Sequence, residues 1–212
     1  MTTTEIITLF ELVVDDVTEL STSEETALVN RIYNRICNGH VWEFLKTNAT
    51  GSILSDADGY YITLPDNFAF FVENNQYTDN SIGVNNNASP KVVFVGTNYQ
   101  RYQIVNYSDR RQYRNKDGYC YLDLANSKIR FTYTPVAFTY DFDYCKVPAT
   151  LTAATSPVFP ARFHEMIAYF MATENDVLQL SPKATSYKDD NTVIARNYLL
   201  DMKHWNSMLI LN

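Results

Sequence analysis

The chain has 212 residues, of which 46% are hydrophobic and only 19% are charged, and its formal net charge is −7. This length suits one large domain or two small ones with a buried core. The negative charge disfavours a protein that grips nucleic-acid phosphates, because such proteins carry a basic face. It permits a protein that surrounds DNA without binding it, since a negative wall repels the duplex and lets it slide.

Tyrosine and phenylalanine are the main compositional excess, with 16 Tyr and 12 Phe in the chain. Such rings favour half-buried pleated surfaces and protein interfaces. Two explanations stay open at this point. The rings either belong to a subunit that buries surface against its neighbours, or they fill the core of a β-sandwich.

The cysteines and the N-terminal residues indicate a protein made in a reducing compartment. Cys37, Cys120 and Cys145 are odd in number and far apart, which argues against a disulfide framework. The first residues lack the basic and apolar regions of a signal peptide, and no apolar run approaches membrane-spanning length. We therefore expect a soluble protein without a membrane partner.

Helical periodicity dominates the first part of the chain. Apolar residues from Glu5 to about Val17 recur at helical spacing and predict a helix. Ser21–Glu24 is a capping-box pattern, which starts a second helix that ends at about Cys37 with Asn38–Gly39 as its C-terminal cap. The two predicted helices form a hairpin whose apolar face needs cover.

From about Gly59 the hydrophobic period changes to two, which predicts short strands. The expected strands are Tyr60–Leu64, Phe68–Val72, Lys91–Val95, Tyr119–Leu124, Lys128–Tyr133 and Val136–Tyr144. The polar segment 74–90 is expected to be a long exposed loop, and Ala125–Ser127 a hairpin turn. Strands of this number and length suggest a small antiparallel sandwich or barrel.

Helical character returns at Pro160, and a last helix is expected from about Asp189, after a break at Ser181–Pro182. The predicted fold class is α+β. In it, the N- and C-terminal helices form a helical bundle, and an antiparallel β-sandwich or barrel-like domain is inserted between them. The expected boundaries are 1–58 with 155–212 for the helical domain, and 59–154 for the inserted β domain.

No motif for catalysis, cofactor binding or metal binding is complete. Phosphate-binding loops and nucleophile elbows are absent from the sequence. Cys37 and His40 have the spacing of half a zinc site, but no second half follows. His164–Glu165 lacks the second histidine of a metalloprotease motif and is expected on the surface of a first helical turn. We predict no catalytic, cofactor-binding or metal-binding residues.

Two weaker combinations stay open. A nucleophile made of Cys145 and His164 has no support beyond composition. Asp141 and Asp143 alternate with apolar residues, so both project from one strand face and could bind calcium or act as a glycosidase pair. The ordinary explanation of this pair is the solvated face of an edge strand.

The most distinctive motif is a cluster of arginines in an acidic protein: Arg110, Arg111 and Arg114, with Tyr113 among them. Arginine suits ion-paired interfaces. The cluster is therefore interpreted as a solvated loop or as a set of ion pairs with a neighbouring subunit or partner. DNA contact is the lesser alternative, because one cluster is a small basic footprint.

The end of the chain is a second candidate interface. On a helical wheel, Tyr198, Met202, Trp205 and Leu209 form the core stripe of the last helix. A further set lies outside this stripe: Met208, Ile210 and Leu211. An apolar chain end is either buried in its own domain or held by another protein, and we predict docking on a partner.

The order of these elements carries a family resemblance. The helical hairpin is followed by Trp42–Leu45, by Tyr61–Phe68, by strands ending at Lys128–Pro135, and by a proline-rich step at Ser156–Pro160. Over nearly the whole chain this layout resembles the head-to-tail adaptor proteins of tailed bacteriophages. The plan is similar to that of the tail tubular protein A group of short-tailed phages.

Two stretches look most like the versions of this protein in crAss-like gut phages: Asp15–Ile32 and Arg111–Lys116. The resemblance implies a non-enzymatic structural protein at the head–tail junction of the virion, assembled in the host cytoplasm. It implies a ring, commonly of twelve copies, beneath the portal protein, with DNA passing through the lumen and with tail or tail-hub proteins attached.

Two other functions are carried as alternatives. One is a carbohydrate- or receptor-binding β-module of a virion accessory protein, favoured by the tyrosine-rich strands and by the Asn-rich segment 74–87. The helices at both ends of the chain argue against it. The other is a hydrolase that uses Asp141, Asp143 or Glu165.

Overall fold

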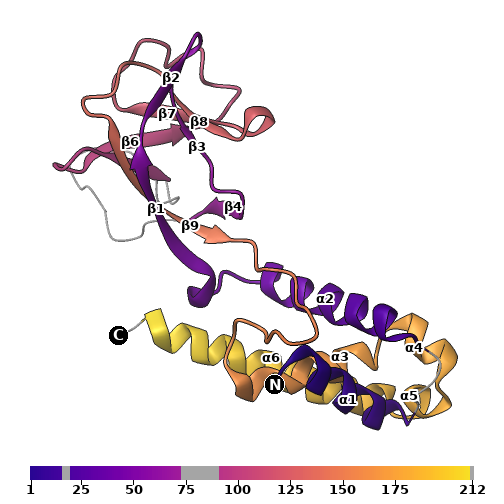
Figure 1. The fold of residues 1–212 in the computed structure, drawn as a ribbon. Coiled ribbons are helices and arrows are strands. Elements are labelled where there is room, and N and C mark those ends of the chain that lie inside the picture. Colours follow the sequence, from indigo (N-terminus) through magenta and orange to yellow (C-terminus); the bar gives the residue numbers. More distant parts are fainter. Residues whose placement is uncertain (16–19, 73–90, 211–212) are drawn as a thin grey trace. The chain divides into compact units, whose positions relative to one another are not determined.

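The computed structural model describes residues 1–15, 20–72 and 91–210 (Figure 1). The chain divides into two compact units. Met1–Leu45 and Pro148–Asn212 make a helical unit, and Lys46–Val147 makes a β unit. Each unit has its own cluster of buried apolar side chains. The α+β class predicted from the sequence is confirmed.

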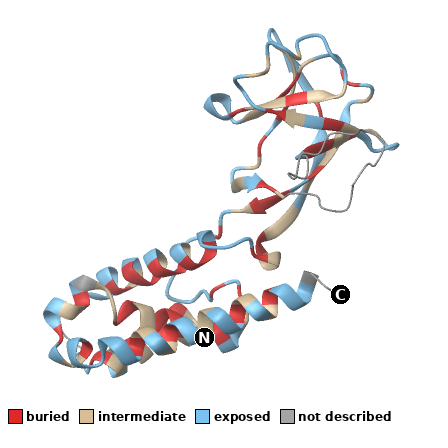
Figure 2. Cartoon of the chain, turned by 180° about the vertical axis from the view of Figure 1, so that it is seen from behind, coloured by how far each residue is buried: buried red, intermediate tan, exposed pale blue. Residues whose placement is uncertain are grey.

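The helical unit is built around its third helix, which contacts the first, second and sixth. Its α-helices are α1 Thr3–Val14, α2 Thr22–Asn38, α3 Glu165–Met171, α4 Asn175–Leu180, α5 Pro182–Ser186 and α6 Lys188–Ile210. Two short 3₁₀ helices belong to the same unit, η1 Glu43–Leu45 and η3 Ala161–Phe163. The buried positions of these helices lie on their inner faces (Figure 2).

Both N-terminal helices begin with a capping box. The predicted one is confirmed, since the Ser21 side chain accepts from the Glu24 amide while the Glu24 carboxylate accepts from the Ser21 amide. A second box, with Thr2 and Glu5, starts α1. Gly39 is the C-terminal cap of α2, as predicted, and its N–H donates to Ile36 O while its φ of −79° stays right-handed.

The β unit contains nine strands among the described residues, and all belong to one curled sheet. They are β1 Lys46–Ser52, β2 Leu54–Asp56, β3 Gly59–Thr63, β4 Phe68–Phe71, β5 Val92–Val95, β6 Gln100–Val105, β7 Tyr119–Asp123, β8 Lys128–Phe131 and β9 Thr139–Lys146. The strand order is β1-β9-β5-β6-β7-β8-β3-β2, and β4 pairs with β9. Every pair is antiparallel except β6 and β7, which run parallel. The described strands thus share one sheet instead of lying in two.

The six predicted strands are present, but β1, β2 and β6 were not predicted. The sequence of β1, KTNATGS, has no alternation of apolar and polar residues, because it is an edge strand with most side chains exposed. β2 has only three residues, all exposed. The predicted loop at 74–90 lies outside the described residues. The β core is aromatic, with Tyr102 and Phe142 fully buried.

Candidate functional site

The arginine cluster lies in the segment 106–118, which links the parallel strands β6 and β7. Three hydrogen bonds fix the base of this segment to the sheet. Asn115 N donates to Thr132 O at 2.9 Å, the Thr132 hydroxyl donates to Lys116 O at 2.7 Å, and the Tyr102 hydroxyl donates to an Asp117 carboxylate oxygen at 2.9 Å. The base of the segment therefore has a defined backbone position on the sheet.

Two members of the cluster are held by contacts within the loop. The Arg110 guanidinium lies 3.7 Å from the centre of the Tyr107 ring and donates to Tyr107 O at 2.5 Å. The Tyr113 ring packs at 4.5 Å on the Tyr119 ring, with the Lys116 ammonium 5.3 Å from its centre. Arg110 and Tyr113 therefore shape the loop before any partner binds.

Arg111 and Arg114 differ from Arg110. Both are exposed, and neither forms a hydrogen bond or an ion pair with any residue that the structure describes. A guanidinium group without an internal partner gains most from an incoming carboxylate, which it can bind through two parallel N–H groups. These two side chains are therefore the part of the cluster suited to bind another molecule.

The second candidate interface lies at the end of α6. Asn206, a fully buried residue of α6, accepts from Glu43 N at 2.8 Å and donates to Val41 O at 3.2 Å. Beyond it, Met208 and Leu209 are each 44% exposed. The expectation that Leu209 belongs to the core stripe is wrong, because the buried contacts of α6 end one turn earlier. The Ile210 side chain and Leu211 lie outside the described part.

The candidate zinc pair does not come together as ligands. Cys37 is buried, and burial raises its thiol pKa to about 12. His40 is exposed and packs its ring against the edge of Trp42. In the three described stretches of the chain, no group of three or more His, Cys, Asp and Glu side chains is arranged to hold a metal ion.

His164 has a structural role in the helical unit. It is 3% exposed, so its predicted surface position is wrong. Its Nε2 lies 2.8 Å from Phe159 O and its Nδ1 lies 2.9 Å from Met1 O, and burial lowers the pKa of the ring. The Glu165 carboxylate accepts a hydrogen bond from the Tyr198 hydroxyl at 2.9 Å. Both ring nitrogens of His164 therefore already contact backbone groups, which leaves neither nitrogen free to act as a base.

Asp141 and Asp143 project from one face of β9, as predicted. The side-chain amide of Asn48 lies across from them on β1 and donates to both, at 2.6 Å and 3.0 Å. The expected edge strand is wrong, because β9 pairs with β1 on one side and with β4 and β5 on the other. The two carboxylates are close because they stand two residues apart on one strand, and Asn48 gives each of them one hydrogen bond.

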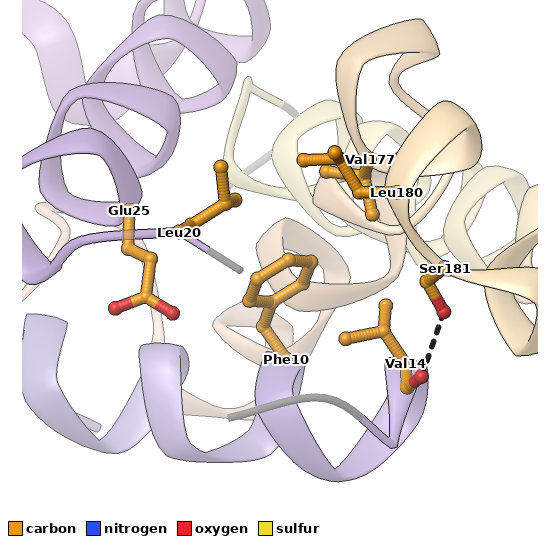
Figure 3. Close-up of a pocket in the computed structure, with 7 residues that line it drawn as sticks. All are labelled: Phe10, Val14, Leu20, Glu25, Val177, Leu180 and Ser181. Carbon is orange, nitrogen blue, oxygen red and sulfur yellow. Dashed lines mark hydrogen bonds between the residues drawn. The ribbon is translucent and has the colours of Figure 1, made fainter. Parts of the chain in front are cut away.

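A small pocket opens between α1, α2 and α4 (Figure 3). Apolar side chains such as Phe10 and Val177 line it, the Ser181 hydroxyl donates to Val14 O at 2.8 Å, and Glu25 lies at its rim. Burial raises the pKa of Glu25, and the nearby Glu11 carboxylate adds to the shift. The space in it for water-sized molecules is about 20 Å³, enough for a single water molecule.

Comparison with protein families decides among the functions. A family model described as SU10 adaptor protein matches residues 1–201, which include the β unit, the arginine cluster and all of the helical unit except residues 202–212. The chain belongs to the SU10 adaptor protein family. A search among curated proteins finds no match.

Membership in the SU10 adaptor family gives the chain a structural role as a phage adaptor, in line with the resemblance inferred from the sequence. An adaptor interacts with other virion proteins, such as portal and tail proteins. This family role favours an adaptor over the carbohydrate-binding module and the hydrolase. Among the described residues, no helix has the length and apolarity needed to cross a bilayer.

A charge cluster around the buried Arg130 in the β unit of this SU10 adaptor was not predicted from the sequence. Arg130 on β8, 6% exposed, donates from Nε to Asp123 at 3.0 Å and through its two terminal nitrogens to Asp56 at 3.0 and 3.2 Å. Lys128 binds the same Asp56 at 2.8 Å and lies over the Tyr61 ring. The only sequence signal is the alternation of Lys128 and Arg130 on one face of a strand.

Proposed function

We propose that the chain is a head-to-tail adaptor that forms a ring beneath the portal protein, through which DNA passes and to which tail proteins attach. The observation that carries this proposal is the family match over residues 1–201. A ring, of twelve copies in this proposal, requires that two different surfaces of each copy meet with rotational closure. We include in this proposal that the chain is an adaptor of the tail tubular protein A type, in the version found in crAss-like phages.

The proposed contacts use the two candidate interfaces. Arg111 and Arg114 bind carboxylates of a neighbouring subunit or partner, and Arg110 and Tyr113 hold the loop in the required shape. The C-terminal segment with Met208, Ile210 and Leu211 docks on the portal protein, and Met208 in it is 44% exposed. The negative net charge of −7 supports a lumen that repels DNA phosphates and lets the duplex slide.

Deleting the coding sequence from the phage genome tests the adaptor role. We expect filled heads without attached tails, because no protein then joins the portal to the tail. Electron microscopy of purified particles and the infectious titre measure the effect, and wild-type protein supplied in trans is the control. Tailed, infectious particles formed without the chain would exclude the adaptor role.

Removing residues 208–212 tests the proposed portal contact. We expect the melting temperature to change by no more than about 2 °C, since Met208 and Leu209 are about half exposed. The shortened chain should nevertheless fail to enter particles, whereas a chain that lacks Asn212 alone should enter normally. A large fall in melting temperature together with normal portal binding would show instead that the tail belongs to the core of the protein.

A further inference from the structure

The charges of the chain are distributed unevenly between its two units. Residues 46–147 contain ten basic and ten acidic side chains, so the β unit is neutral. The remaining segments contain 17 − 10 = 7 basic and 24 − 10 = 14 acidic side chains, so the helical unit carries the whole net charge of −7. Each copy therefore presents a concentrated basic loop on one unit and an acidic surface on the other.

α6 carries three acidic and three basic residues and is neutral as a whole, but two of its carboxylates share one face with exposed aliphatic side chains. Val193 and Leu200, 56% and 62% exposed, lie two helical turns apart on the side opposite the buried Met202. Asp190 and Asp201 are exposed beside them, and neither carboxylate forms an ion pair among the residues that the structure describes. We call these four residues the α6 outer face. Arg196 lies on its other flank.

The loop that carries the arginine cluster has complementary chemistry. Tyr107, 51% exposed, presents an aromatic ring under Arg110, while Arg111 and Arg114 have no carboxylate partner among the described residues. Tyrosine and arginine are the residues enriched at the centres of protein interfaces. Their natural counterpart is a surface that offers aliphatic side chains for the rings and carboxylates for the guanidinium groups, which is the composition of the α6 outer face.

We propose that the loop 107–114 of one copy docks on the α6 outer face of a second copy. Arg111 and Arg114 bind the carboxylates of Asp190 and Asp201, and the tyrosine side of the loop covers Val193 and Leu200. Because the two surfaces differ and every copy carries both, the contact is head-to-tail and can repeat around a ring. The inference rests on the proposed ring-forming function, for which it supplies the subunit contact.

A charge exchange on the purified full-length protein tests this contact. Arg111→Glu with Arg114→Glu, or Asp190→Arg with Asp201→Arg, should each weaken self-association on the order of tenfold or more, measured by sedimentation at several concentrations. The variant with all four changes should recover association to within about threefold of the wild type. An equimolar mixture of the two double variants should recover as well, because their altered surfaces are complementary to each other.

Lys91→Glu is the matched control, since Lys91 is an exposed lysine of the β unit outside the loop, and it should leave association unchanged. Circular dichroism melting confirms that each variant folds. Failure of the fourfold variant to recover overturns the proposed contact, and so does wild-type protein that stays monomeric at about 1 mM. Incorporation of wild-type protein into particles tests the adaptor role separately. If the protein enters particles but does not self-associate, only the proposed contact between the loop and the α6 outer face is rejected.

Discussion

We expect Trp42→Ala to lower the free energy of unfolding of the helical unit by about 3–5 kcal/mol. The Trp42 side chain is fully buried, and its ring stacks on Phe44 at a centroid distance of 5.5 Å. Its indole N–H donates to Ile36 O at 2.9 Å, near the end of α2. Alanine therefore leaves a large cavity where the second helix joins the 3₁₀ helix η1.

Trp42→Phe separates the hydrogen bond from the packing. The ring remains, and the Ile36 carbonyl keeps its bond from Gly39 N at 3.2 Å, so we expect a loss of about 0.5–1.5 kcal/mol. Both tryptophans of the chain belong to the helical unit, and Trp205 reports its unfolding by fluorescence when Trp42 is replaced. A loss below about 1 kcal/mol for the alanine variant would contradict the packing argument.

Arg130→Met should destabilise the β unit by about 3–5 kcal/mol, because removing one partner of a buried ion pair leaves the others without compensation. Arg130 links β8 both to a strand that is distant in sequence, through Asp56 74 residues away, and to the neighbouring strand, through Asp123 7 residues away. The methionine fills much of the volume but cannot neutralise the two carboxylates. Amide hydrogen exchange of β8 measures the loss.

The effect of Arg130→Met should depend on pH in a defined direction. Hydrogen bonds from Arg130 and Lys128 hold the pKa of Asp56 well below its usual range, and those from Asn126 and Arg130 lower the pKa of Asp123. Groups with a lowered pKa stabilise the folded state above their unfolded pKa, about 4, and this contribution is lost as the pH falls through the folded-state value. The difference between wild type and variant should therefore be largest at neutral pH and shrink in acid.

Lys128→Met is the matched control for Arg130→Met. Lys128 lies on the same strand and binds the same Asp56, but its side chain is 22% exposed, against 8% for Arg130. A partly exposed ion pair contributes little, so we expect a loss below about 1 kcal/mol. Equal losses for the two variants would show that burial of the guanidinium is not what makes this cluster important.

The helical elements could be predicted because their signals are local. The capping box at Ser21 and Glu24 needs only side chains three residues apart, and the periodicity of α6 repeats over many turns. The strand β1 gave no such signal, because its polar residues are determined by pairing with β9. Its pairing depends on a segment almost a hundred residues further along the chain, which periodicity cannot reveal.

The candidate site could also be predicted only in part. The sequence singled out Arg110, Arg111 and Arg114 as a cluster, but it did not show which of them have partners within the protein. The structure separates Arg110, which lies on the Tyr107 ring, from the two exposed arginines. Arg130 was overlooked because its partner Asp56 comes close only through the pairing of β3 with β8 and of β2 with β3.

The pairing of β1 with β9 also bears on how the chain folds. Lys46, the first residue of the β unit, lies opposite Cys145, close to its last residue Val147, so the unit closes its own ends. Without a folded β unit, contacts of α1 and α2 with α3 and α6 would close a flexible loop of more than a hundred residues. Shortening the effective loop about tenfold saves about 2 kcal/mol of chain entropy. A formed β unit thus makes assembly of the helical unit easier through chain connectivity alone, without any contact between the two units.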